Sequence, residues 1–246
     1  MKVRIKFAKR GSMKFIGHLD IMRYFQKVMR RAEVDIAYSE GFSPHQKMSF
    51  AAPLGVGATS EGEYLDIEVN STGSSYEMIE KMNSTMVEGM KVLSYVKLDD
   101  NAANAMSLVA AADYLVSYRE GHRPELFDDY MKLKEAFNTF INSDAINVLK
   151  KTKKSEKEVN IKPMIYSTEI NDGAICMKLA TGSAKNLKPE LVMQAFHNYN
   201  NLELGEFDIE VCRLETYGST LKEESEDIDE IINHLKPLDA FGTEII

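Results

Sequence analysis

The chain has 246 residues, of which 44% are hydrophobic and 28% are charged, and its formal net charge is −8 at pH 7. This length suffices for two small domains, and no apolar run approaches the roughly 20 residues that cross a bilayer, which excludes a membrane-inserted protein. The two cysteines, Cys176 and Cys212, lie in apolar strand-like runs, so we expect reduced thiols and a cytoplasmic protein.

Charge is distributed unevenly along the chain. Residues 1–50 contain 11 Lys and Arg against 4 Asp and Glu, whereas residues 201–246 contain 3 against 13. Because the field of an exposed charge fades over roughly 8 Å at physiological salt, the amino-terminal segment can attract an anionic partner despite the acidic total. The acidic total argues against indiscriminate coating of nucleic acid.

The first hundred residues predict the order strand, helix, strands, helix, strand. The helix at 18–33 has an apolar stripe opposite a basic one, and Ser74 with Glu77 forms a capping-box pattern before the second helix. The predicted strands are 3–9, 36–38, 47–52, 63–69 and 90–98. In strand 63–69 strict alternation predicts that Tyr64, Asp66 and Glu68 face solvent.

A similar order recurs after the polar stretch 99–104. The predicted elements are a strand at 113–118, a helix from Pro124, a lysine-rich hairpin at 148–160, strands at 161–170 and 174–179, a helix from Pro189 and a strand at 207–214. We therefore predict an α+β fold of two tandem ferredoxin-like (βαββαβ) units with antiparallel sheets. The predicted domains are 1–100 and 105–217, followed by an acidic tail at 218–246.

The predicted anion-binding surface combines the basic side of helix 18–33 with the loop that follows it. On the helix, Arg23, Lys27 and Arg30 gather on one side with Arg31 at their edge. In the loop, the candidate binding residues are Gly41, Phe42, Ser43, His45 and Lys47. The alternative is an ordinary solvated face on a core helix.

His18 is the candidate catalytic residue. It lies at the expected start of the helix, where the positive end of the helix dipole disfavours an imidazolium and keeps a neutral base available. A neutral base suits metal-free cleavage of RNA at a 2'-hydroxyl. The alternative is that His18 caps or packs the helix.

The sequence contains no motif that would bind a metal or a cofactor. A radical S-adenosylmethionine enzyme needs three closely spaced cysteines for its cluster, whereas Cys176 and Cys212 are 36 positions apart. The same count excludes zinc ribbons, and the five histidines form no helical pair with an acid. No Walker sequence occurs, so we expect neither a metal nor a cofactor.

Several motifs resemble a bacterial family known as the radical-SAM-associated, or radical-SAM-linked, domain of unknown function. They are Phe15-Ile16-Gly17-His18-Leu19-Asp20, Arg23, Arg30-Arg31-Ala32, Tyr38-Ser39-Glu40-Gly41-Phe42-Ser43-Pro44 and Ser49-Phe50-Ala51, with looser likeness at Lys188-Pro189-Glu190 and Arg213. The resemblance implies a radical S-adenosylmethionine protein as partner, because family members are found beside or fused to such proteins. It also implies a setting of RNA processing or the ribosome.

Three functions therefore remain open. The first is an accessory binding protein that recognises RNA or another anionic partner and acts with a radical S-adenosylmethionine protein. The second is a metal-independent endoribonuclease, broadly similar to CRISPR RNA-processing proteins, with His18 as base and Arg23 or Lys47 on the phosphate. The third is a pure protein–protein adaptor that uses the same surface for an acidic partner.

Overall fold

The computed structural model describes residues 1–151, 156–183, 185–221, 223 and 225–246, and within them the chain has a mixed α+β fold. The strands are β1 (Lys2–Lys9), β2 (Met48–Phe50), β3 (Thr59–Glu68), β4 (Met90–Leu98), β5 (Val109–Tyr118), β6 (Asn147–Lys151), β7 (Glu156–Asn160), β8 (Ile165–Asn171), β9 (Ala174–Ala180), β10 (Ile209–Ser219), β11 (Leu235–Pro237) and β12 (Thr243–Glu244). The α-helices are α1 (His18–Arg31), α2 (Ser75–Ser84), α3 (Ala105–Leu108), α4 (Tyr130–Ile141), α5 (Pro189–Tyr199) and α6 (Ile228–Asn233). Short 3-10 helices are η1 (Gly11–Phe15), η2 (Glu125–Phe127), η3 (Lys162–Met164) and η4 (Leu238–Phe241).

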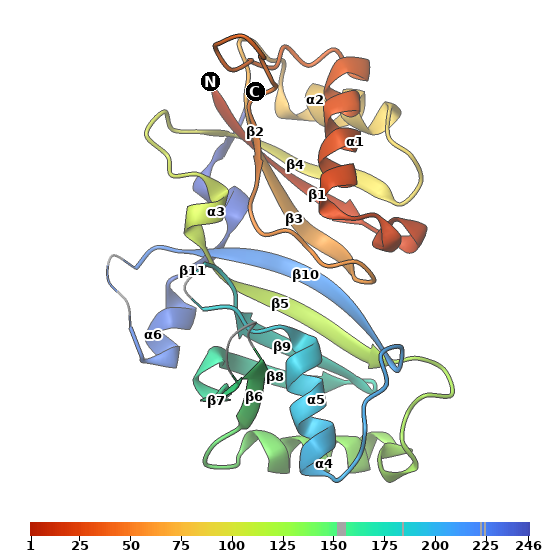
Figure 1. The fold of residues 1–246 in the computed structure, drawn as a ribbon. Helices are drawn as coiled ribbons and strands as arrows, with labels where there is room; N and C mark the ends of the chain where they lie inside the picture. Colours follow the sequence, from red (N-terminus) through yellow and green to blue (C-terminus); the bar gives the residue numbers. More distant parts are fainter. Residues whose placement is uncertain (152–155, 184, 222, 224) are drawn as a thin grey trace.

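One large sheet runs through the described part of the molecule (Figure 1). Its order is β12-β4-β1-β3-β10-β5-β9-β8, with β2 added to β3 and β11 added to β10. Neighbouring strands are antiparallel except β3 and β10, which pair in parallel through Cys212 with Thr59 and Arg213 with Ser60. The two predicted sheets are therefore joined edge to edge into one sheet, and this β3–β10 junction is called the seam below.

The amino-terminal half packs α1 and α2 on one face of β4-β1-β3-β2. The predicted apolar stripe of α1 is confirmed, since Ile21, Phe25 and Val28 are buried against Val3, Ile5 and Phe7 of β1 in a single core. The capping box predicted for α2 is also present. The strand predicted at 36–38 is reduced to two isolated bridges.

The carboxy-terminal half repeats this arrangement with β10-β5-β9-β8 and the helices α4 and α5, whose apolar side chains share a second core. The predicted start of α5 at Pro189 is confirmed. The helix predicted from Pro124 is wrong at its start, because η2 and a turn intervene and Asp129 caps α4 before Tyr130. The side chain of Asp129 accepts a hydrogen bond from the N–H of Lys132, a better N-terminal signal than proline alone.

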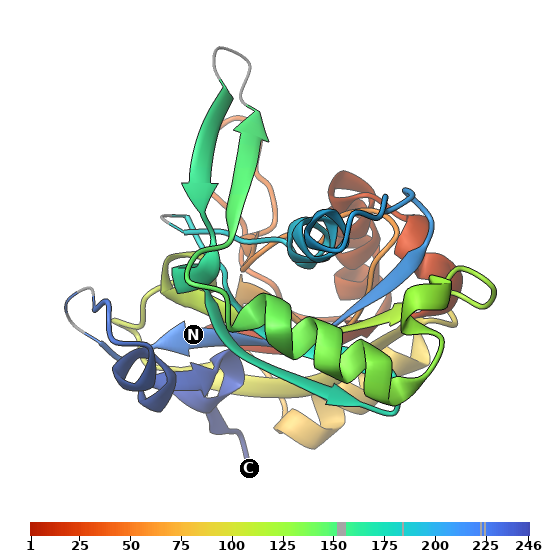
Figure 2. The same cartoon turned by 90° about the horizontal axis from the view of Figure 1, so that it is seen from below.

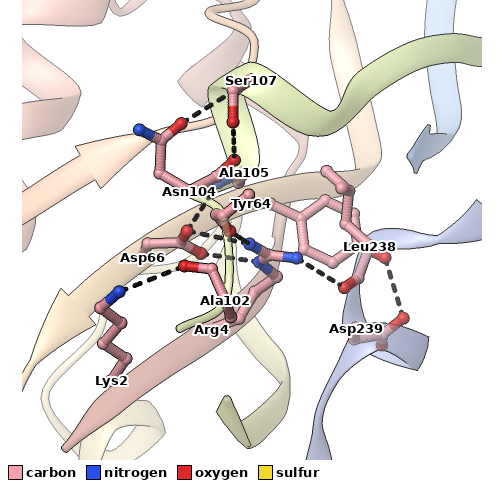
Figure 3. Close-up of polar contacts among 11 residues, drawn as sticks. Lys2, Arg4, Tyr64, Asp66, Ala102, Asn104, Ala105, Ser107, Leu238 and Asp239 are labelled. Carbon is pink, nitrogen blue, oxygen red and sulfur yellow. Dashed lines mark hydrogen bonds and ion pairs between the residues drawn. The ribbon is translucent and has the colours of Figure 1, made fainter. Parts of the chain in front are cut away.

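The opposite face of the sheet, called the back face here, is covered around Arg4, Tyr64 and Asp66 by α3 and the carboxy-terminal segment. The prediction of a solvated face on β3 is wrong at Tyr64, which is 2% exposed, and at Asp66, which pairs with the fully buried Arg4. Arg4 also donates to the carbonyl of Leu238 (Figure 3) and to that of Ala103. Segment 218–246, expected as a tail, thus supplies the end of β10, α6, β11, η4 and β12.

The hairpin β6–β7 forms a separate two-stranded sheet that projects from the body of the molecule (Figure 2). The hairpin predicted at 148–160 is confirmed by these two strands. Lys153 and Lys154 lie outside the described residues. Within the described residues, none of the helices is both long enough and apolar enough to span a bilayer.

Candidate functional site

The predicted cations of α1 form an exposed face, called the α1 cationic face below. Arg23, Lys27, Arg30 and Arg31 are all exposed, because they occupy the side of the helix opposite its buried stripe. Arg23 lies 3.3 Å from the carboxylate of Asp20, but both side chains are about two-thirds exposed, so this pair is weak. Among the described residues, the other three cations form no ion pair.

The loop between Ser39 and His45 is closed at its neck and exposed at its tip. The N–H of Ser39 donates to the carbonyl of His45 at 2.8 Å, and the Ser39 hydroxyl lies 2.8 Å from His45 Nδ1. His45 is therefore held by the loop itself. Gly41 has a φ of 107°, which favours glycine, and together with exposed Ser43 it presents Phe42 fully to solvent.

The carbonyl of Gln26 joins the loop to the α1 cationic face. The carbonyl oxygen of Gln26 lies 3.3 Å from Arg30 Nε and 3.4 Å from Nε2 of the buried Gln46, at the base of the loop. The two predicted parts of the surface are thus brought together one helical turn from Arg30. Sequence reasoning missed Gln46, because nothing in the local pattern marks a glutamine that bridges two segments.

Lys47 forms an ion pair within the protein. Its ammonium lies 2.8 Å from the carboxylate of Glu68 on β3, and this hydrogen bond raises the pKa of Lys47. Both side chains are 42% exposed. Lys47 is therefore the predicted binding residue with the strongest internal partner, and an incoming anion must compete with Glu68.

His18 occupies the first helical position after Gly17, which is the N-cap of α1. Its ring is half-buried and packs perpendicular to Phe50, with 5.2 Å between ring centroids. No hydrogen bond to its ring occurs in the part of the chain that the structure describes. The geometry provides a packing contact, and no described residue is placed to orient His18 as a base.

A cavity of about 330 Å³ lies beside the seam, on the face that carries the helices. We call it the seam cavity. One wall is the loop between β2 and β3, and the other is the loop from β9 into the start of α5. Its principal lining residues are Ala51, Pro53, Met106, Tyr114, Thr181, Ser183, Asn186, Lys188, Glu190 and Arg213.

Arg213 is the buried cation of the seam cavity. It is 4% exposed, and its Nη1 donates to the carbonyl of Ala52 at 2.7 Å and to the carboxylate of Glu63 at 3.0 Å. Burial opposes its charge, but Glu63 and the adjacent Tyr114 more than offset burial, and the pKa of Arg213 is raised. Its Nε is buried without a hydrogen-bond partner in the described residues.

Lys9 is a second buried cation close to Arg213. It is 3% exposed, and it forms no ion pair with any described residue. Burial and the positive charge of Arg213 lower the pKa of Lys9, while Glu63 acts in the opposite direction. Sequence reasoning noted Arg213 only through a family resemblance, and no local signal joined it to Lys9.

The described residues offer little for metal binding or for nucleophilic catalysis by cysteine. They contain no group of three or more His, Cys, Asp and Glu side chains placed to hold a metal ion. Cys176 and Cys212 are free and partly buried, and burial raises the pKa of both thiols. Neither thiol has the lowered pKa of a nucleophile.

Comparison with known proteins adds one relationship. No curated protein matches the chain. The model of a family described as "Uncharacterized protein conserved in bacteria (DUF2344)" matches residues 2–189, which include the whole α1 cationic face and its loop and end at the start of α5. Association with radical S-adenosylmethionine proteins stays a prediction. Because the match covers most of its length, the chain belongs to this bacterial family.

Proposed function

We propose that this protein is a non-catalytic accessory module that binds single-stranded RNA on the α1 cationic face and the Phe42 loop. The observation that carries the proposal is the shared Gln26 carbonyl, which ties a row of exposed cations to a loop with a fully exposed aromatic ring. Cations that follow the phosphates, together with a ring on which a base stacks, are the usual means of binding single strands.

The proposal includes the partner implied by the family resemblance, a radical S-adenosylmethionine protein to which the RNA is presented, and it includes a cytoplasmic location. It also interprets each half as a ferredoxin-like unit. The support for that interpretation is the matching strand orders β4-β1-β3-β2 and β10-β5-β9-β8, each with two helices on one face.

Charge reversal on α1 tests the proposal. The triple variant Arg23→Glu, Lys27→Glu and Arg30→Glu should weaken binding of a fluorescent single-stranded RNA by about tenfold or more in anisotropy titrations, and should flatten its salt dependence by about two units of log–log slope. The matched control reverses Lys81, Lys91 and Lys97, exposed lysines of α2 and β4. It changes the net charge equally and should leave affinity within about twofold. Equal affinity of the two triple variants would refute the proposal.

Replacement of Phe42 by alanine separates stacking from charge. The ring buries no surface, so stability should not change, whereas RNA affinity should fall by roughly 1–3 kcal/mol for one lost base stack. The salt dependence should stay that of the wild type. Unaltered RNA affinity in Phe42→Ala would refute the stacking part of the proposal. Phosphate binding by the cations would then be the part that stands.

The same preparation distinguishes the other functions. Cleavage of the RNA by wild-type protein, lost in His18→Ala, would replace the binding module by an endoribonuclease. Retention of an acidic protein from lysate, unaffected by nuclease and lost in the α1 triple variant, would replace it by an adaptor.

A further inference from the structure

We propose that the seam cavity is a binding site for a phosphate monoester with a compact organic body, separate from the α1 cationic face. The phosphate would lie between Arg213 and the start of α5. At about 330 Å³ the cavity is at the lower end of the range for small-molecule sites, roughly 300–1,000 Å³.

Arg213 supplies the first argument. Both of its hydrogen bonds within the described residues leave from Nη1, and Nε is buried without a partner. A buried donor without a partner costs free energy, and a guanidinium edge is suited to bidentate recognition of phosphate. Nε itself is closed to solvent, so an anion in the cavity would meet Arg213 at the part of its side chain that lines the cavity.

The buried charges supply the second argument. Lys9 and Arg213 bring two positive charges to the seam, and Glu63 brings one negative charge. A net buried positive charge is costly unless an anion compensates it. A phosphate bound in the seam cavity would compensate the charge of Arg213, which lines the cavity. Lys9 does not line it and would be affected only by the longer-range field of the phosphate.

The start of α5 supplies the third argument. This helix has 11 residues. Its first residue, Pro189, has no N–H, and the N–H of Leu191 donates to the carbonyl of Lys188, so Glu190 keeps the first-turn N–H that no side chain caps. Such a terminus attracts phosphate. Exposed Lys188 adds a positive charge at the rim, and exposed Glu190 is the acid there that a phosphate must avoid.

The remaining walls select the body of the ligand. Ala51, Pro53 and Met106 form apolar surface, while Thr181, Ser183 and Asn186 offer hydroxyl and amide groups. A compact molecule with one apolar side and a few polar groups would fill this space. Two sources share that chemistry, namely a free nucleotide and the 5'-phosphorylated end of an RNA strand.

Calorimetric titration of the full chain with nucleoside 5'-monophosphates tests the proposal, with unphosphorylated nucleosides as the negative arm. We expect saturable binding of at least one monophosphate and none of its nucleoside. A short RNA with and without a 5'-phosphate distinguishes the two sources. Binding of free monophosphate identifies the first, and binding of phosphorylated RNA alone identifies the second.

Two variants locate the site. Lys188→Glu changes an exposed side chain and should weaken binding by about tenfold. Arg213→Lys should weaken binding at least as much, because lysine lacks the planar guanidinium that suits phosphate. Lys81→Glu on α2 is the charge-matched control and should bind as the wild type does. If Arg213→Lys fails to fold, Asn186→Asp, also exposed, replaces it. Absence of binding in every arm, or wild-type affinity in Lys188→Glu and the second variant, would overturn the proposal.

Discussion

Replacement of Arg4 by methionine should destabilise the protein strongly, because this cation holds the back face together. The Arg4 side chain is 0% exposed and binds both oxygens of Asp66, at 2.7 and 2.9 Å. It also donates to the carbonyl of Leu238 at 3.0 Å (Figure 3) and to that of Ala103 at 3.2 Å. The Asp66 carboxylate, 14% exposed, would keep the N–H of Ala105 as a partner.

The expected cost follows from this geometry. Removal of one member of a buried ion pair leaves the other charge uncompensated and costs about 3–5 kcal/mol. Two carbonyls would also lose a charged donor. Arg10 is a matched control, since its pair with Glu61 has side chains 49% and 35% exposed, and Arg10→Met should cost about 0–1 kcal/mol.

Urea unfolding followed by circular dichroism measures both variants. Arg4→Met should lower the midpoint much more than Arg10→Met, with similar denaturant slopes. The double variant Arg4→Met with Asp66→Leu should regain part of the loss, because no buried charge is left alone. Equal costs of about 1 kcal/mol or less for the two arginine variants would refute the reasoning.

Two further predictions concern the second half and the seam. His197 is 1% exposed, and burial lowers its pKa, so the unfolded chain takes up a proton that the folded chain resists. Its stabilising effect should be complete above about pH 6.5 and decline as the pH falls below that value, and His197→Gln should reduce this slope in urea titrations at several pH values. Identical slopes would show that His197 is not responsible. At the seam, a Cβ on Gly62 would lie 2.5 Å from the Cα of Glu215, so Gly62→Ala should cost roughly 1–3 kcal/mol. Gly55→Ala, which meets open space, should be nearly neutral in the same unfolding measurement, and comparable stability of these two variants would contradict the close packing of β3 on β10.

Local features could be predicted from the sequence by itself. The buried stripe of α1, the capping box of α2 and the start of α5 at Pro189 follow from patterns within one or two helical turns. The exposure of the α1 cations follows from the same periodicity, because a helix that buries one side must present the other. The order of strands and helices within each half was predictable for the same reason.

Long-range placement was decided only by the tertiary structure. Alternation along β3 indicated a solvated face, but it could not show that η4 and α3, which lie far from β3 in the sequence, cover Tyr64 and Asp66. The seam cavity depends on Arg213 meeting Glu63 across 150 positions. Local periodicity specifies which side of an element is apolar. Which distant segment covers that side depends on how the two halves dock, and that docking joined two expected sheets into one.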